Sequence, residues 1–168
     1  MKVIDIYIDS DVIVASEIEE EKNHTDSKRF MEYVLGNKSP SMTFYTSVFS
    51  FVELASAMIR RTSNSDKAYS LLYRIRNSWK KSIKPLPPIP AKLRTSFTGL
   101  VESLIETSIK YRTPSADTMH AQTIAGYEID FLVTWNKKHF SYMESQIPNL
   151  KVLTPREMLE ELAKNTNL

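Results

Sequence analysis

The sequence contains no cysteine, so neither a disulfide framework nor a thiolate metal site can form. No apolar stretch approaches the roughly 20 residues that cross a bilayer. The start of the chain does not fit a signal peptide, because acidic residues interrupt its apolar run. Internal repeats and low-complexity segments are also absent. These absences predict a cytoplasmic protein without a membrane segment.

Enough apolar sequence is present to build a core. Of 168 residues, 42% are hydrophobic and 10% aromatic, and we expect a single domain over residues 1–168. The net charge is only +2, but residues 56–112 hold 12 Lys/Arg against 3 Asp/Glu, a local charge of +9, and the remainder holds 10 against 17, or −7. This basic segment predicts a polyanionic partner at one face, although two ordinary solvated helices would give the same count.

Short runs of β-branched and aromatic residues alternate with segments of helical periodicity. Strands are expected at residues 3–8, 42–45, 130–134 and 152–153. Helices are expected at residues 24–35, 48–59, 65–80, 90–111, 116–125, 137–145 and 155–163. Residues 85–90 contain four prolines and predict a connector or an edge segment. The alternation predicts an α/β protein of three layers, α/β/α, around a mostly parallel central sheet.

Acidic side chains recur where such a sheet binds ligands, beyond the carboxyl ends of its strands. Asp9 and Asp11 follow the first strand, Glu53 lies early in the helix after the second strand, and Asp117 lies in the first turn of its own helix. Carboxylates crowded together repel one another unless cations lie between them. All-oxygen sites select hard ions such as Mg²⁺ or Mn²⁺. We therefore predict a metal site at these four residues.

The three histidines give no zinc pattern. His24, His120 and His139 are far apart in sequence, although folding could still bring them together. We interpret His120 and His139 as hydrogen-bonded supporting groups rather than catalytic bases.

Four segments together resemble a PIN domain: residues 7–11 (YIDSD), 50–54 (SFVEL), 115–121 (SADTMHA) and 131–140 (FLVTWNKKHF). The match runs in order along nearly the whole chain, and the four together are more specific than any one of them. The resemblance implies a metal-dependent endoribonuclease using Mg²⁺ or Mn²⁺, often the toxin of a toxin–antitoxin pair. It further implies RNA as substrate, an antitoxin protein as partner and a homodimer.

The resemblance assigns roles to individual residues. It places catalytic and metal-binding roles on Asp9, Glu53 and Asp117, and a substrate-binding or supporting role on Thr134. The reaction it implies is phosphodiester hydrolysis by an activated water, leaving a 3′-hydroxyl and a 5′-phosphate.

The sequence departs from the family pattern at two positions. Asn136 stands where a fourth acidic residue is usual, and Asp11 stands where the family commonly has Asn. If the backbone stays extended through Ser10, then Asp9 and Asp11 point to the same side, and Asp11 could reach a second metal ion and compensate for Asn136. The alternative is that Asn136 marks lost catalysis, in an inert scaffold that binds RNA or protein.

A face of the helix at residues 65–80 pairs aromatic rings with basic groups. Tyr69, Tyr73, Arg76 and Lys80 lie together, opposite the apolar stripe. We predict that they bind single-stranded RNA, and a dimer or antitoxin surface would use the same residues.

A second enzyme class shares part of the pattern. In a haloacid-dehalogenase-type phosphatase, Asp9, Asp11, Thr134 and Lys137 would act as nucleophile, acid and phosphate contacts. That alternative leaves the helices of Glu53 and Asp117 unexplained.

Overall fold

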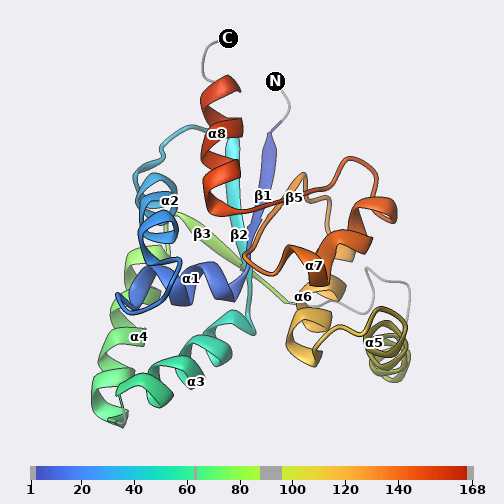
Figure 1. The fold of residues 1–168 in the computed structure, drawn as a ribbon, viewed down its shortest axis with the longest axis horizontal. Helices are drawn as coiled ribbons and strands as arrows, with labels where there is room; N and C mark the ends of the chain where they lie inside the picture. The colour runs from blue at the N-terminus through green and yellow to red at the C-terminus, as the bar shows by residue number, and fades with distance from the viewer. Residues whose placement is uncertain (1–2, 63, 88–95, 166–168) are drawn as a thin grey trace.

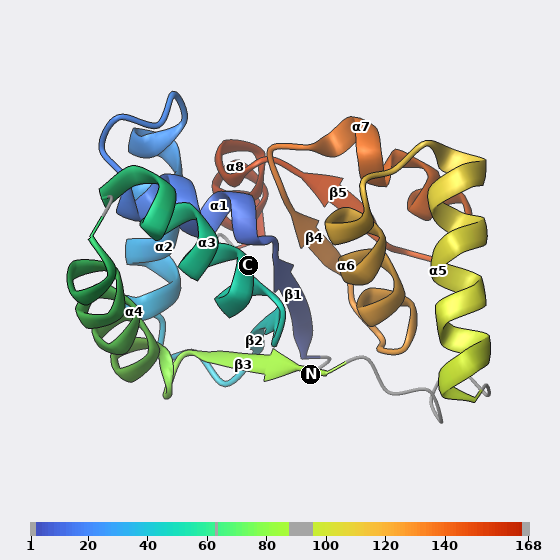
Figure 2. The ribbon, with the colours of Figure 1, turned by 90° about the horizontal axis from the view of Figure 1, so that it is seen from below.

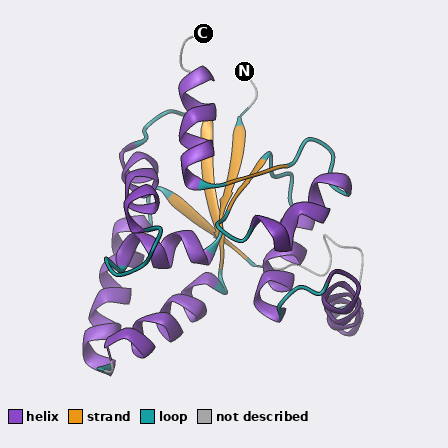
Figure 3. Cartoon of the chain, viewed as in Figure 1, coloured by secondary structure: helices purple, strands orange, loops and turns teal. Residues whose placement is uncertain are grey.

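A computed structural model describes residues 3–62, 64–87 and 96–165. It contains a five-stranded sheet in the order β3-β2-β1-β4-β5, and each neighbouring pair is parallel (Figure 3). The strands are β1 Ile4–Ile8, β2 Met42–Ser47, β3 Ile83–Leu86, β4 Phe131–Val133 and β5 Lys151–Leu153. The predicted parallel sheet is therefore confirmed.

Helices cover both faces of the sheet, which gives the expected three layers (Figure 1). They are α1 Ser10–Glu17, α2 His24–Gly36, α3 Ser50–Thr62, α4 Ser65–Trp79, α5 Phe97–Tyr111, α6 Ser115–Ala125, α7 Lys137–Phe140 and α8 Pro155–Asn165, with a 3₁₀ helix at Ser141–Ser145. Alternate residues of a strand point to opposite faces. Ile6 and Ile8 of β1 accordingly pack with α1, α2, α3 and α8, whereas Tyr7 packs with α6 and α7.

The central strand β1 determines where the functional residues meet. It pairs with β2 on one side and with β4 on the other. The Asp9 amide donates to the Val133 carbonyl at 3.0 Å, and the Thr46 hydroxyl donates to the Ile8 carbonyl at 2.8 Å. The carboxyl ends of β1, β2 and β4 therefore lie at one edge of the sheet, as predicted.

Three predicted elements differ from the observed ones. No helix is expected directly after β1, yet α1 begins there, because an Asp-Ser-Asp sequence favours a helix N-terminus as well as a turn. The helix expected at residues 137–145 is divided into α7 and the 3₁₀ helix. Of the helix expected at residues 90–111, α5 begins at Phe97, and residues 90–95 lie outside the described part of the chain. Of the connector or edge segment expected at residues 85–90, Pro85 lies in edge strand β3, as predicted, and residues 88–90 lie outside the described part of the chain.

The basic segment is divided between two sides of the molecule. Basic residues from Arg60 to Lys84 belong to α3, α4 and β3 and the turns between them, whereas Lys110 and Arg112 lie at the end of α5. Figure 2 shows α4 and α5 at opposite ends of the molecule. A polyanionic partner at one face would therefore meet the α3–α4–β3 side.

Helix α5 leaves an apolar stripe open to solvent. Leu100 is buried, but Phe97 and Ile109 are each 74% exposed and Ile105 is 54% exposed. The helix packs mainly against α6.

Within the described ranges, no helix has the length and apolar character needed to cross a membrane.

Candidate active site

Asp9 is the most buried acid of the site. It follows β1 and caps α1, where its Oδ1 accepts from the Ser10 amide at 2.7 Å. Its Oδ2 accepts from the Thr134 hydroxyl at 2.8 Å, and the residue is 1% exposed. Burial raises the pKa of Asp9, and the nearby Asp117 and Glu53 charges raise it further, while His120 and Thr134 oppose the rise. The carboxylate is thus held in a desolvated position among other acids.

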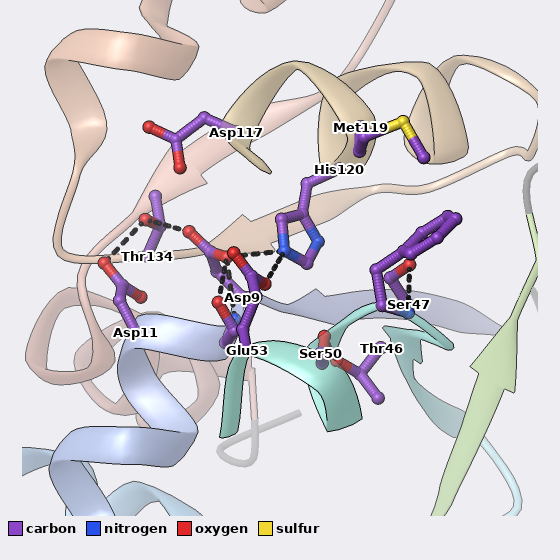
Figure 4. Close-up of polar contacts among 12 residues, drawn as sticks. Asp9, Asp11, Thr46, Ser47, Ser50, Glu53, Asp117, Met119, His120 and Thr134 are labelled. Atoms are coloured by element: carbon purple, nitrogen blue, oxygen red, sulfur yellow. Dashed lines mark hydrogen bonds and ion pairs between the residues drawn. The ribbon is translucent and has the colours of Figure 1, made fainter. Parts of the chain in front are cut away.

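Asp11 lies beside Asp9, but for a different reason from the predicted one. Ser10 begins a helix, so the extended backbone expected there is wrong. Asp11 is held instead through its Oδ2, which accepts from the Trp135 amide at 2.9 Å and from the Thr134 hydroxyl at 3.2 Å. Figure 4 shows that hydroxyl between the two carboxylates. Thr134 therefore joins Asp9 to Asp11.

The second oxygen of Asp11 is a buried polar atom that has no hydrogen-bond partner among the residues the structure describes. Burial and the charge of Asp9 raise the pKa of Asp11 well above its ordinary value. An unpartnered buried carboxylate oxygen is unfavourable unless a proton or a cation reaches it.

Glu53, in the first turn of α3, is held by a histidine. Its Oε2 lies 2.7 Å from Nε2 of His120, whose Nδ1 lies 2.6 Å from the hydroxyl of Tyr7. The same Nε2 is 3.5 Å from Oδ1 of Asp9. Burial by itself lowers the pKa of His120, but the charges of Asp9 and Glu53 outweigh it and the pKa is raised. His120 thus lies between two acids and is hydrogen-bonded, and its supporting role, as opposed to a catalytic one, stays a prediction.

Asp117 completes the acidic group from α6. Its Oδ2 lies 2.5 Å from Nδ1 of His139, so His139 is also a hydrogen-bonded partner. The charge of Asp117 contributes to the raised pKa of both Asp9 and His120. The predicted acids therefore come together from α1, α3 and α6 at the end of β1 (Figure 4).

The donor set suits a hard divalent cation in its chemistry, because it is made of carboxylate oxygens and includes the unpartnered Oδ1 of Asp11. The geometry is not closed around one. Among the described residues, no three acidic or histidine side chains converge closely enough to enclose a metal ion. Glu53 and Asp117 are instead turned toward imidazoles. Metal binding would require these two carboxylates to exchange a histidine for the ion.

Asn136 reaches the site through its backbone. Its amide donates to the Thr134 hydroxyl at 2.9 Å, and its side chain makes no capping bond for α7. Lys137 turns away and pairs with Glu157 at 2.9 Å. The supporting position of Thr134 follows from these contacts, whereas a substrate role for Asn136 stays a prediction.

Two residues had been given no role from sequence. Tyr7 was read only as part of a buried strand, yet its hydroxyl bonds His120. Sequence reasoning assigns no role to Ser10, yet its amide bonds Asp9. A tyrosine in a strand of mostly apolar residues was the available signal for Tyr7, since a buried tyrosine usually finds a polar partner.

The four residues predicted to bind RNA lie apart from the carboxylates. Tyr69, Tyr73, Arg76 and Lys80 line a groove of about 570 Å³ between α3, α4 and β3. The structure therefore brings these four together, as the helical spacing predicted.

The chain was compared with known proteins. No protein-family model matches the sequence, and no curated protein matches it. Three solved structures are similar in fold. VapC20 of Mycobacterium tuberculosis, described as a sarcin-ricin loop cleaving toxin, has a TM-score of 0.59 at 15% identity, covering 87% of this chain and 98% of its own.

The other two structures are VapBC complexes. VapBC-1 from nontypeable Haemophilus influenzae gives a TM-score of 0.58 at 15% identity and covers 91% of this chain and 99% of that one. VapBC2 from Rickettsia felis, bound to a DNA fragment from its promoter, gives a TM-score of 0.57 at 16% identity. The match covers 89% of this chain and 97% of that one. The chain therefore has the PIN-domain fold, which the sequence motifs predicted.

Proposed function

We propose that this protein is a metal-dependent endoribonuclease that hydrolyses RNA phosphodiester bonds and acts as the toxin of a toxin–antitoxin pair. The observation that carries the proposal is that Asp9, Asp11, Glu53 and Asp117 lie at one edge of the sheet, where the charges of Glu53 and Asp117 act on Asp9 and that of Asp9 acts on Asp11. The similar solved structures support it, since one is described as a sarcin-ricin loop cleaving toxin and two are VapBC structures.

The four carboxylates would hold Mg²⁺ or Mn²⁺. Such an ion supplies Lewis-acid activation of water and of the scissile phosphodiester. The Thr134 hydroxyl holds Asp9 and Asp11 side by side, and His120 orients Glu53. No side chain has to act as a covalent nucleophile.

The proposal extends to partners. An antitoxin protein is expected from the VapBC likeness. A homodimer is expected from the family resemblance, and the exposed Phe97, Ile105 and Ile109 of α5 offer an apolar surface for it.

The phosphatase alternative receives little support from the contacts. Both carboxylate oxygens of Asp9 accept hydrogen bonds and the residue is buried, so neither oxygen is presented as a nucleophile. Lys137, which would contact phosphate, pairs with Glu157. The observed geometry is equally compatible with the inert scaffold, so only an activity measurement separates that alternative from the nuclease.

The test is cleavage of end-labelled RNAs, both single-stranded and hairpin, by purified protein with Mg²⁺, Mn²⁺ or EDTA. Wild type is compared with Asp9→Asn and with Glu160→Gln, an exposed acid of α8 as matched control. Metal-dependent cutting that is lost in Asp9→Asn and kept in Glu160→Gln supports the proposal. Mn²⁺ binding without cutting of any RNA supports the scaffold, and a trapped aspartyl-phosphate analogue supports the phosphatase.

A further inference from the structure

The groove between α3, α4 and β3 has an aromatic floor and a basic rim. Phe51 and Trp79 contact each other at the floor, with ring centroids 6.2 Å apart. Tyr69 and Tyr73 stand at the rim and are 73% and 63% exposed. The remaining lining residues are Val48, Leu72, Arg76, Lys80, Ile83 and Pro85.

Helix periodicity explains the rim. Ala68, Ile75 and Trp79 are buried, and they fix the inward face of α4. Tyr69, Tyr73, Arg76 and Lys80 follow one another at spacings of four, three and four residues. Residues at these spacings share one face of a helix, so the two tyrosines lie in line with the two basic residues on the other face. Two large aromatic rings left in solvent beside two cations contribute little to the core, so their arrangement suits a ligand better than it suits folding.

The charge of the groove indicates the ligand. Among the described residues that line it, none is acidic, and both charged ones are basic. Exposed rings stack on nucleobases of any sequence, and neighbouring cations neutralise phosphates. This combination matches single-stranded RNA.

The position of the groove favours RNA over a protein partner. Phe51 lines the groove and Glu53 belongs to the acidic group, and both are in the first turn of α3. The two residues lie on opposite flanks of that helix, a separation of about one helix diameter, about 10 Å. The groove therefore adjoins the same helix that carries Glu53, so an RNA strand held at the carboxylates has this groove within reach.

We propose that this groove binds the single-stranded RNA that flanks the cut site, with bases stacked on Tyr69 and Tyr73 and phosphates paired with Arg76 and Lys80. The inference rests on the proposed ribonuclease function, for which it defines a second contact with the substrate.

The test measures RNA binding without cleavage. Anisotropy of a labelled 12-nucleotide single-stranded RNA is recorded in EDTA for wild type, for Tyr69→Ala with Tyr73→Ala, and for Arg76→Glu with Lys80→Glu. The matched control is Arg29→Glu with Lys38→Glu, which makes the same charge change at exposed residues of α2 and the following loop.

Each groove variant should bind the RNA at least about tenfold more weakly than wild type, and the control should stay close to wild type. Replacing the two cations should also reduce the slope of log affinity against log salt by about 1.4.

Unchanged binding in both groove variants would overturn the inference, as would an equal loss in the control. Unchanged RNA binding combined with altered self-association in sedimentation would identify a protein interface instead, and would also overturn it. The binding is read without metal, so the two proposals can fail separately. Groove-dependent binding without metal-dependent cutting supports the groove and rejects the nuclease. Metal-dependent cutting combined with RNA binding that does not depend on the groove supports the nuclease and rejects the groove.

Discussion

Nε2 of His120 lies 2.7 Å from Oε2 of Glu53, while the other ring nitrogen meets the hydroxyl of Tyr7. This imidazole is buried with an acid on one side and a phenol on the other. Burial raises the pKa of Glu53, but the hydrogen bond and charge of His120 outweigh it and lower the pKa. The two groups therefore stabilise each other's charged forms.

The His120 pair predicts a pH dependence of stability. A histidine whose pKa is raised by folding stabilises the protein fully below its ordinary value of 6.5, and this contribution is lost as pH rises through the folded pKa. In EDTA, the free energy of unfolding should therefore fall above pH 6.5. His120→Gln should flatten that fall and lower stability at pH 6 by about 1–3 kcal/mol, because the Tyr7 hydroxyl and Glu53 lose a buried partner.

Urea denaturation across pH measures this dependence. His24→Gln is the control, since His24 bonds the Ala15 carbonyl away from the acids. Identical pH profiles for wild type and His120→Gln would contradict the assignment of the His120–Glu53 pair.

Asp11→Asn should have opposite effects on stability and on metal binding. The pKa of Asp11 is raised, so its favourable contribution exists below its ordinary value of 3.8 and is lost as pH rises through the folded pKa. An amide carbonyl can still accept from Trp135 and Thr134. At pH 7 in EDTA the variant should be more stable by about 1 kcal/mol, while binding Mn²⁺ more weakly. Calorimetric Mn²⁺ titration and thermal melts measure both, and unchanged metal affinity would show that Asp11 does not compensate for Asn136.

Thr134→Val tests whether the threonine hydroxyl holds the two carboxylates. The change keeps the side-chain shape but leaves Oδ2 of Asp9 without its donor and the Asn136 amide without an acceptor. We expect a loss of about 1–3 kcal/mol in the free energy of unfolding and a clear fall in RNA cleavage. Thr134→Ser retains the hydroxyl and should recover most of both. Equal defects in the two variants would mean that the methyl group, not the hydroxyl, is what matters.

Tyr142 offers a test of the structure near the site. Its ring stacks on Tyr111 with centroids 3.9 Å apart, its hydroxyl is buried without a partner, and burial followed by the charges of Tyr111 and Asp117 raises its pKa to about 12. Tyr142→Phe should remove the tyrosine that ionises near pH 12 in ultraviolet titration and raise stability by about 1 kcal/mol. Tyr111→Phe should instead lower stability, because Tyr111 accepts a hydrogen bond from Gln146. A destabilised Tyr142→Phe protein would contradict the unpartnered hydroxyl.

The position of the site at the carboxyl end of the sheet was predictable from sequence. Short apolar strands end at acidic residues, and the carboxyl ends of parallel strands lie at the same edge of a sheet. Asp9 follows from that rule and Glu53 lies in the helix after β2, whereas the place of Asp117, in a helix that follows another helix, was implied by the family resemblance. The link from Asp11 to Asp9 was not predictable, since it depends on the Thr134 hydroxyl, 123 positions away in sequence from Asp11. The roles of Tyr7 and His120 likewise depend on contacts across 113 positions.

Local signals were ambiguous elsewhere. Asp-Ser-Asp is compatible with a turn and with a helix start, and only packing of Val12 and Ile13 in the core decides for α1. The periodicity of α5 marks an apolar face correctly, but periodicity cannot say whether that face is covered, and Phe97 and Ile109 are exposed.

The central claim is that the acids around Asp9 form a divalent-metal site, and Mn²⁺ binding followed by electron paramagnetic resonance tests it most directly. Wild type, Asp9→Asn and Glu160→Gln are titrated at pH 7, each after its fold is confirmed by circular dichroism. The account predicts saturable binding to wild type and Glu160→Gln, and at least about tenfold weaker binding to Asp9→Asn. Equal Mn²⁺ affinity in all three proteins, or no saturable binding to wild type, would contradict it.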